Sequence, residues 1–122
     1  MTSAQASSIN NVTYGAAKAT PPVTGLDTCS YHNTGKHASP IDIQDLDVWV
    51  MSIPGCWASL QSSDGPGTNI TGLGDAAFGY SIGIDVKIGD RCVKVSGLTA
   101  AEFHNNYAPD IAMAKIILGK LS

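Results

Sequence analysis

The sequence has little charge, no long apolar run and no paired cysteine motif, and each absence excludes a class of protein. Only 14% of the 122 residues are charged, against roughly 25% in typical globular domains. The seven Lys and Arg residues are scattered and form no basic stripe, so nucleic-acid binding is not expected. No apolar run approaches the roughly 18 residues that a membrane-spanning helix needs, so no transmembrane segment is expected. No C-x-x-C occurs and no Cys/His spacing suits zinc, and we predict no cofactor.

The first residues, MTSAQASSINN, also lack the charged and apolar regions of a signal peptide. Met1 is then expected to start a mature or trimmed domain, unless the protein is cytosolic. The composition favours the first reading, because 13 Gly and many Ser, Thr and Asn replace charged residues, a mixture common in exported bacterial proteins. We therefore expect an extracellular or cell-envelope location.

Alternating apolar residues predict an antiparallel β-sheet. The clearest element is the segment 80–98, in which apolar residues alternate with small or polar ones on both sides of a Gly89-Asp90 turn. The alternating residues are Ile82, Ile84, Val86, Ile88, Val93 and Val95. This pattern predicts a hairpin, 81–88 and 91–97, at the centre of the sheet.

The other predicted elements complete an α+β fold with the order α-β-β-α-β-β-α. Ser52 is a candidate N-cap with Pro54 in the following first turn, Gln44-Asp45 a candidate β-bulge, and Thr99 the start of a capping box. Strands are expected at 26–33 and 40–50, and helices at 3–12, 52–63 and 110–121. We expect residues 1–25 to form an N-terminal helix and a Pro/Gly connector, and residues 26–122 to form one domain.

The stretch GLGDAA (72–77) matches the Gly/Ala form of the dinucleotide-binding fingerprint. That motif needs a strand before it and a helix directly after it, so that the helix N-terminus meets the pyrophosphate. Here a Gly/Pro/Ser loop precedes the stretch and strand-like residues follow it. We therefore predict a structural turn, in which Gly72 and Gly74 allow a tight bend and Asp75 closes it by hydrogen bonding.

The segment around this turn resembles a group of small secreted proteins and lipoproteins from actinomycete-type bacteria, which have no assigned function. The resemblance rests on CSYHN (29–33), on TGLGDAAFG followed by IDVKIGDRCVKVSG, and on AMAKIILGKL (112–121). Several such lipoproteins resemble the PsbP/Mog1-like α/β/α sandwich, which implies a binding or accessory role at the cell envelope. No lipobox cysteine precedes the domain, so lipid anchoring is not inferred.

Three cysteines, Cys29, Cys56 and Cys92, allow one disulfide and one free thiol. The exported composition favours a disulfide over three reduced thiols in a cytosolic protein. Loop-closure entropy does not separate Cys29–Cys56 from Cys29–Cys92. A strand-to-strand bridge needs neighbouring strands, whereas a cysteine in a helix has more freedom to approach. We therefore predict the pair Cys29–Cys56, with Cys92 free.

Aromatic residues are the best candidates for a binding site. Most aromatic side chains belong to cores, but a subset is expected to line an apolar cleft under the 64–72 loop. The candidates are Trp57 and Phe78 first, then Tyr80 and Trp49.

Histidines and acids offer a second possible site. A metal site would need His32 and His37 to meet on one ion with the help of Asp42, Asp45 or Asp47, but histidines in surface loops are the commoner case. We therefore predict no metal site.

The leading functional hypothesis is a non-enzymatic, exported binding or accessory module. Its expected partner is an envelope component, an apolar small molecule or another protein. The main alternative is a small isomerase- or hydrolase-like enzyme that uses His32 or His104 with an Asp, although no spacing identifies catalytic residues. Such an enzyme would place a histidine near a carboxylate and away from bulk water. A self-assembling structural subunit is the third alternative.

Overall fold

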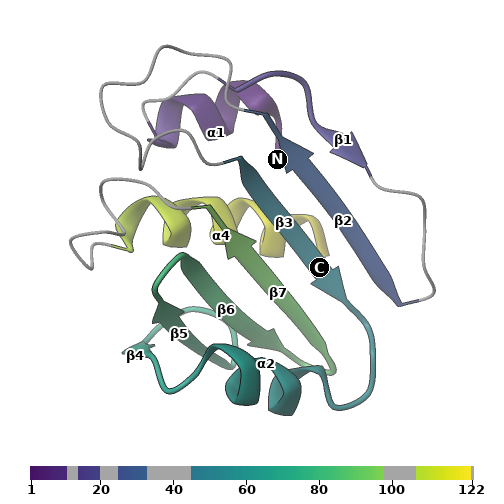
Figure 1. The fold of residues 1–122 in the computed structure, drawn as a ribbon, viewed down its shortest axis with the longest axis vertical. Coiled ribbons are helices and arrows are strands. Elements are labelled where there is room, and N and C mark those ends of the chain that lie inside the picture. The colour runs from purple at the N-terminus through teal and green to yellow at the C-terminus, as the bar shows by residue number, and fades with distance from the viewer. Residues whose placement is uncertain (11–13, 20–24, 33–44, 98–106, 122) are drawn as a thin grey trace.

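A computed structural model describes residues 1–10, 14–19, 25–32, 45–97 and 107–121. These form a seven-stranded antiparallel sheet with three helices, so the α+β prediction is confirmed (Figure 1). The strand order is β1-β2-β3-β7-β6-β5-β4. The strands are β1 (Lys18–Ala19), β2 (Leu26–Tyr31), β3 (Leu46–Met51), β4 (Thr68–Ile70), β5 (Ala76–Tyr80), β6 (Gly83–Ile88) and β7 (Arg91–Ser96).

The helices lie on the two faces of the sheet. Helices α1 (Ser3–Asn10) and α4 (Ala108–Leu121) pack against each other, and α4 covers β6 and β7 (Figure 1). Helix α2 (Cys56–Asp64) packs on β7 from the opposite side. We call these the α4 face and the α2 face.

Strand alternation assigns each side chain of the central hairpin to one face. On the α4 face, Ile84, Val86, Val93 and Val95 are completely buried in the main core. That core also includes Met113 of α4, which is likewise 0% exposed, and Ala6 of α1. On the α2 face, a smaller apolar cluster comprises Met51, Cys56, Leu60 and Cys92.

The predicted hairpin is confirmed as β6 and β7, with Gly89 in its turn at φ 59°. Strand β7 is the central strand of the seven. The exception is Ile82, which lies in the turn before β6 and is 42% exposed rather than part of the apolar face. The predicted helix 110–121 is also confirmed as α4, packed on the hairpin.

The sheet contains three strands that the predicted order omits. β4 lies in the expected 64–72 loop, β5 begins at Ala76 within GLGDAA, and β1 lies in the expected connector. The N-terminal segment therefore contributes both a strand of the sheet, through β1, and Ala6 of α1 to the core. These strands have two to five residues, and short strands show too few alternations to be recognised.

The N-cap prediction for α2 is wrong. The N-cap is Gly55 at φ 76°, which makes no side-chain capping bond, and not Ser52. A left-handed residue at this position redirects the chain, and glycine adopts that conformation without steric cost. The candidate bulge at Gln44 and the capping box at Thr99 lie outside the described residues.

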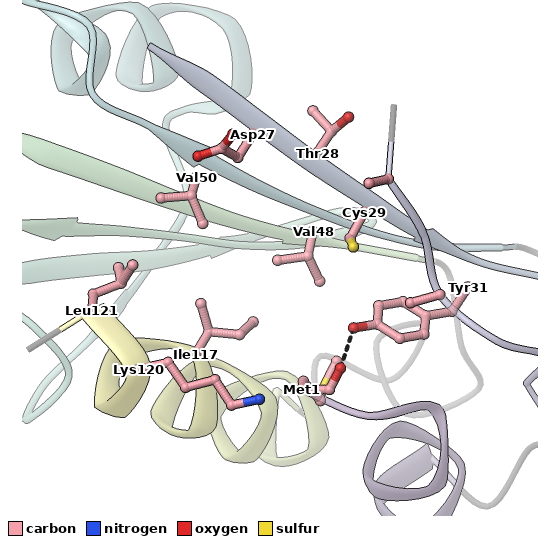
Figure 2. A pocket seen from close by; sticks show the side chains of 12 residues that line it. Met1, Asp27, Thr28, Cys29, Tyr31, Val48, Val50, Ile117, Lys120 and Leu121 are labelled. Carbon is pink, nitrogen blue, oxygen red and sulfur yellow. Dashed lines mark hydrogen bonds between the residues drawn. The ribbon is translucent and has the colours of Figure 1, made fainter. Parts of the chain in front are cut away.

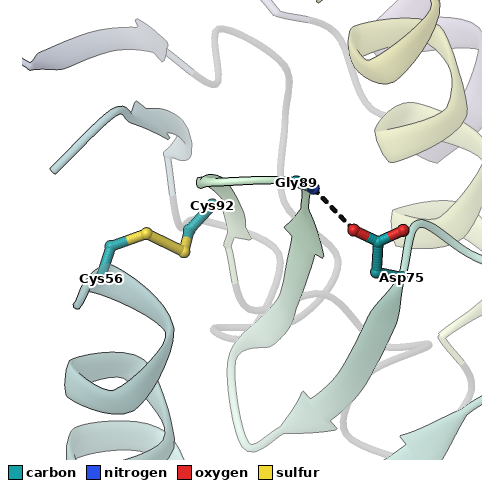
Figure 3. Close-up of a disulfide and its surroundings, with 4 residues drawn as sticks. All are labelled: Cys56, Asp75, Gly89 and Cys92. Atoms are coloured by element: carbon teal, nitrogen blue, oxygen red, sulfur yellow. Dashed lines mark hydrogen bonds between the residues drawn. A yellow bond between two sulfur atoms is a disulfide. The ribbon is translucent and has the colours of Figure 1, made fainter. Parts of the chain in front are cut away.

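The predicted Cys29–Cys56 disulfide is also wrong, because Cys56 pairs with Cys92 and leaves Cys29 as the free thiol (Figure 3). Cys29 and Cys56 lie on opposite faces of the sheet, since Cys29 packs against the main core and Cys56 against the smaller cluster. Cys92 points to the α2 face and lies in register with Met51, the last residue of β3 before the connection to α2. The predicted number of bridges and free thiols is correct.

The first four residues of GLGDAA form the turn between β4 and β5, and Asp75 links this turn to the β6–β7 turn. Gly72 and Gly74 have φ values of 76° and 59°, and a Cβ on Gly74 would lie 2.5 Å from the Lys87 carbonyl oxygen. The Asp75 amide donates a hydrogen bond to that oxygen at 2.7 Å. The Asp75 carboxylate accepts one from the Gly89 amide at 2.6 Å (Figure 3). A strand rather than a helix follows, so the geometry of a dinucleotide site does not form.

Candidate functional site

All four predicted aromatic residues lie on the α2 face. Trp57 of α2 packs on Phe78 of β5, with ring centroids 5.4 Å apart. Trp49 and Tyr80 form a second group through Lys94, whose ammonium lies 5.4 Å from the Trp49 ring and 5.3 Å from the Tyr80 ring. The structure thus brings the four residues together as two pairs rather than as one cluster.

The Trp57–Phe78 pair lines a cavity of about 560 Å³, which we call the aromatic cavity. The 65–67 turn forms part of its wall, and a Cβ on Gly67 would lie 2.5 Å from the Phe78 ring. The exposed amide side chains of Gln61 and Asn69 also line it. The complete lining is Trp57, Gln61, Gly65, Pro66, Gly67, Asn69, Ala76, Ala77 and Phe78, which contains no charged side chain.

Beside the aromatic cavity, a buried polar cluster lies between the end of α2 and the sheet. Lys94 and Asp85 are cross-strand neighbours, and the Lys94 ammonium lies 2.9 Å from the Asp64 carboxylate. Asp85 is 0% exposed, and its carboxyl group lies beside that of Asp64. This cluster therefore places two carboxyl groups and one ammonium in a largely dry environment.

Burial and the neighbouring Asp64 carboxylate raise the pKa of Asp85 to about 8. Burial acts on Asp64 in the same direction, but its interactions with Asp85 and Lys94 outweigh that effect and lower its pKa. At neutral pH the cluster therefore consists of a protonated Asp85, an ionised Asp64 and a charged Lys94. Its net charge is close to zero, which reduces the cost of burying it.

A second cavity, of about 340 Å³, lies on the α4 face between β2, β3 and the last turns of α4 (Figure 2). We call it the apolar cavity. Cys29, Tyr31 and Asp27 line it from β2, and Lys120 lines it from α4. The other lining residues are Met1, Ala17, Ala19, Thr28, Val48, Val50, Ile117 and Leu121.

At one end of the apolar cavity, the pKa values of the Tyr31 hydroxyl and the Met1 amino group are shifted. The Tyr31 hydroxyl donates a hydrogen bond to the Met1 carbonyl oxygen at 2.5 Å, and burial, with a smaller effect from Cys29, raises the pKa of Tyr31. Hydrogen bonding to Lys120, followed by burial, lowers the pKa of the Met1 amino group. Lys120 therefore exerts its positive charge at this end of the cavity.

His32 does not form a catalytic pair shielded from water. Its Nδ1 lies 2.9 Å from an Asp45 carboxylate oxygen, but the two side chains are 72% and 47% exposed. The Asp47 carboxylate instead accepts a hydrogen bond from the Ser30 hydroxyl at 2.5 Å. His37, Asp42 and His104 lie outside the described residues. Within the described residues, no three His, Cys, Asp or Glu side chains gather in a way that would hold a metal ion.

Comparisons with protein-family models, curated proteins and solved structures find no match to this chain. No helix in the described parts of the chain has the length and hydrophobicity to cross a membrane. The two cavities and the polar cluster are the features of the described residues that bear on function.

Sequence reasoning missed the polar cluster and the apolar cavity. Asp85 and Lys94 occupy the polar positions of an alternating pattern, and such positions usually face solvent. Asp85 is instead fully buried, and Lys94 is half-buried and contacts Asp64 at the end of α2. Cys29 is likewise not recognisable as a cavity residue, because the N-terminal segment, β2, β3 and α4, which are far apart in the sequence, line the cavity together. No local signal in the sequence identifies either feature.

Proposed function

We propose that this protein is a non-enzymatic, exported binding module and that its ligand occupies the aromatic cavity. The observation that carries the proposal is the Trp57–Phe78 pair, which lines a cavity of about 560 Å³ together with two amide side chains. Ligand sites typically have volumes of about 300–1,000 Å³, apolar walls and a few polar groups that fix orientation. The aromatic cavity has each of these properties.

The lining favours a neutral saccharide as the ligand. A saccharide ring presents an apolar C–H face that can pack on an aromatic ring, with hydroxyl groups around its edge. Gln61 and Asn69 each offer both donors and an acceptor, which suits hydroxyl groups. Since no charged side chain lines the cavity, an ion would find no counter-charge there.

Two observations support an exported protein acting at the cell envelope. The Cys56–Cys92 disulfide fits a non-reducing compartment, since disulfides are rare in reducing cytosol. The resemblance to small secreted bacterial proteins points in the same direction. Together with the cavity chemistry, they favour an envelope saccharide as the natural ligand.

Isothermal titration calorimetry against soluble neutral oligosaccharides tests the proposal. The probes are a tetramer of β-1,4-linked N-acetylglucosamine and a glucose tetramer. We expect at least one to bind, and Trp57→Ala to lower its affinity by about tenfold or more, because central aromatic contacts dominate such interfaces. Trp49→Ala is the matched control, since Trp49 is an aromatic residue on the same face but outside the cavity.

Two results would contradict the proposal. One is that neither tetramer binds at millimolar concentration. The other is equal loss of affinity in the Trp57→Ala and Trp49→Ala variants, which would show that the cavity is not the site.

A further inference from the structure

We propose that the apolar cavity on the α4 face is a second binding site, for a medium-length acyl chain whose carboxylate lies at Lys120. This proposal is independent of the saccharide site, because the two cavities lie on opposite faces of the sheet and share no lining residue. It rests on the shape and lining of the cavity and on the positions of its two charged side chains.

The walls of the cavity suit a hydrocarbon chain. Val48 and Val50 line it from the sheet, and Ile117 and Leu121 line it from α4, so apolar side chains face each other across it (Figure 2). Burying a methylene group in such a site is worth about 0.8 kcal/mol. At about 340 Å³, the cavity is near the lower limit for ligand pockets, which favours a medium-length chain over a long one.

The charged residues give the site a direction. Lys120 extends from α4, and its ammonium points toward the end of the cavity formed by Met1 and Tyr31 (Figure 2). Asp27 lines the opposite wall, at the start of β2. A carboxylate is attracted to Lys120 and repelled by Asp27, so the two side chains together orient an acyl anion.

Cys29 provides a reporter inside the cavity. It is the free cysteine, since Cys56 and Cys92 form the disulfide, and its side chain lines the cavity. A thiol reagent added to the native, oxidised protein therefore reacts at this position. A ligand in the cavity covers the thiol and slows the reaction, whereas a ligand bound elsewhere leaves the rate unchanged.

The experiment measures the rate of Cys29 labelling by Ellman's reagent as a function of ligand concentration. The probes are decanoate, decanol and decyltrimethylammonium, which share one chain and differ in headgroup charge. We expect decanoate to protect Cys29 at the lowest concentration and decyltrimethylammonium to be the weakest. Ala19 lines the cavity as the cross-strand neighbour of Cys29, so Ala19→Trp should fill the space beside Cys29 and abolish protection by decanoate.

The role of Lys120 is tested by charge removal. Lys120→Gln should weaken protection by decanoate by about 1.4- to fivefold, the range of a solvent-exposed ion pair, and leave protection by decanol unchanged. Lys115→Gln is the matched control, because Lys115 is an exposed lysine of the same helix outside the cavity. In the Lys115→Gln variant, decanoate should protect Cys29 at the same concentration as in the unmodified protein.

Three outcomes would overturn the proposal. If decanoate did not slow the labelling of Cys29, the cavity would not be a binding site for an acyl chain. Tighter protection by decyltrimethylammonium would show that Asp27 rather than Lys120 selects the headgroup. Equal effects of Lys120→Gln and Lys115→Gln would show that the charge acts through the net charge of the protein and not within the cavity.

Discussion

The two faces of the sheet are built differently. On the α4 face the central strands present four fully buried aliphatic side chains, Ile84, Val86, Val93 and Val95, to the helices. On the α2 face the same strands present Asp85, Lys94 and Cys92, which are joined to α2 by an ion pair and a disulfide. One face is therefore held by apolar burial, and the other by specific links beneath a short helix.

The difference shows how a nine-residue helix is fixed to a sheet. Helix α2 buries only Cys56 and Leu60, so its apolar contribution is small. The disulfide fixes its first residue, and the contact between Asp64 and Lys94 fixes its last. The aromatic cavity lies between these two attachment points, which hold Trp57 over Phe78.

Removing the disulfide should produce the largest effect, and it tests whether the α2 face depends on its links. We expect Cys56→Ala with Cys92→Ala to lower the free energy of unfolding by about 4 kcal/mol, because the bridge closes a long loop, with a sequence separation of 36 residues. Urea denaturation monitored by circular dichroism measures the change. Cys29→Ala, which removes the free thiol, is the control. If Cys29→Ala lowered the free energy of unfolding as much as the double variant, the disulfide would not be what stabilises the α2 face.

The sequence predicts the central part of the fold because local pattern and tertiary structure agree there. The alternation around Gly89 predicts β6 and β7, and the apolar spacing after Pro109 predicts α4. The pairing of Cys56 with Cys92 was not predicted, because it depends on β3 lying beside β7. Strand neighbours far apart in the sequence leave no local pattern.

The aromatic part of the candidate site was easier to anticipate than the charged part. Large aromatic residues near a Gly/Pro-rich loop are conspicuous, and the structure places Trp57 and Phe78 beside that loop. Asp85 looks like an exposed strand residue until α2 is placed over it. Whether a polar strand residue is buried depends on what covers the sheet, and that is a property of the whole fold.

Truncating a core side chain tests the α4 face. Met113→Ala should lower the free energy of unfolding by about 3 kcal/mol, because Met113 is 0% exposed and its loss leaves a cavity among packed aliphatic residues. Ile53→Ala is the control, since Ile53 is 41% exposed and its loss should cost less than about 0.5 kcal/mol. Chemical denaturation of both variants measures the difference. If Met113→Ala cost no more than Ile53→Ala, the α4 face would not be the main core.

The pH dependence of stability tests the polar cluster on the α2 face. The pKa of Asp85 is about 8 in the folded protein, above its ordinary value. Between these two pKa values the folded state holds a proton that the unfolded state has released. The contribution of Asp85 to stability is therefore complete at acid pH and is lost as the pH rises toward 8.

Asp85→Asn should remove this dependence, since an amide does not titrate. Relative to the unmodified protein, we expect the variant to gain roughly 1–3 kcal/mol of stability between pH 5 and pH 7. Denaturation curves at several pH values check this. Asp90→Asn is the control, because it removes the same charge from an exposed residue of the β6–β7 turn and should show no such trend. If the difference in stability between Asp85→Asn and the unmodified protein did not change with pH, Asp85 would be ionised in the folded protein at neutral pH.

The smallest expected effect concerns the contact between the GLGDAA turn and the β6–β7 turn. Asp75 accepts a hydrogen bond from the Gly89 amide, while its own amide bonds to the Lys87 carbonyl oxygen. Asp75→Ala removes only the first bond and should lower the free energy of unfolding by about 1 kcal/mol. Asp75→Asn keeps a carbonyl acceptor and should lose less, and Asp90→Ala is a nearby control. Thermal denaturation ranks the three variants. If Asp75→Ala and Asp90→Ala were equally stable, the carboxylate would not join the two turns, and the glycines alone would account for the form of this stretch.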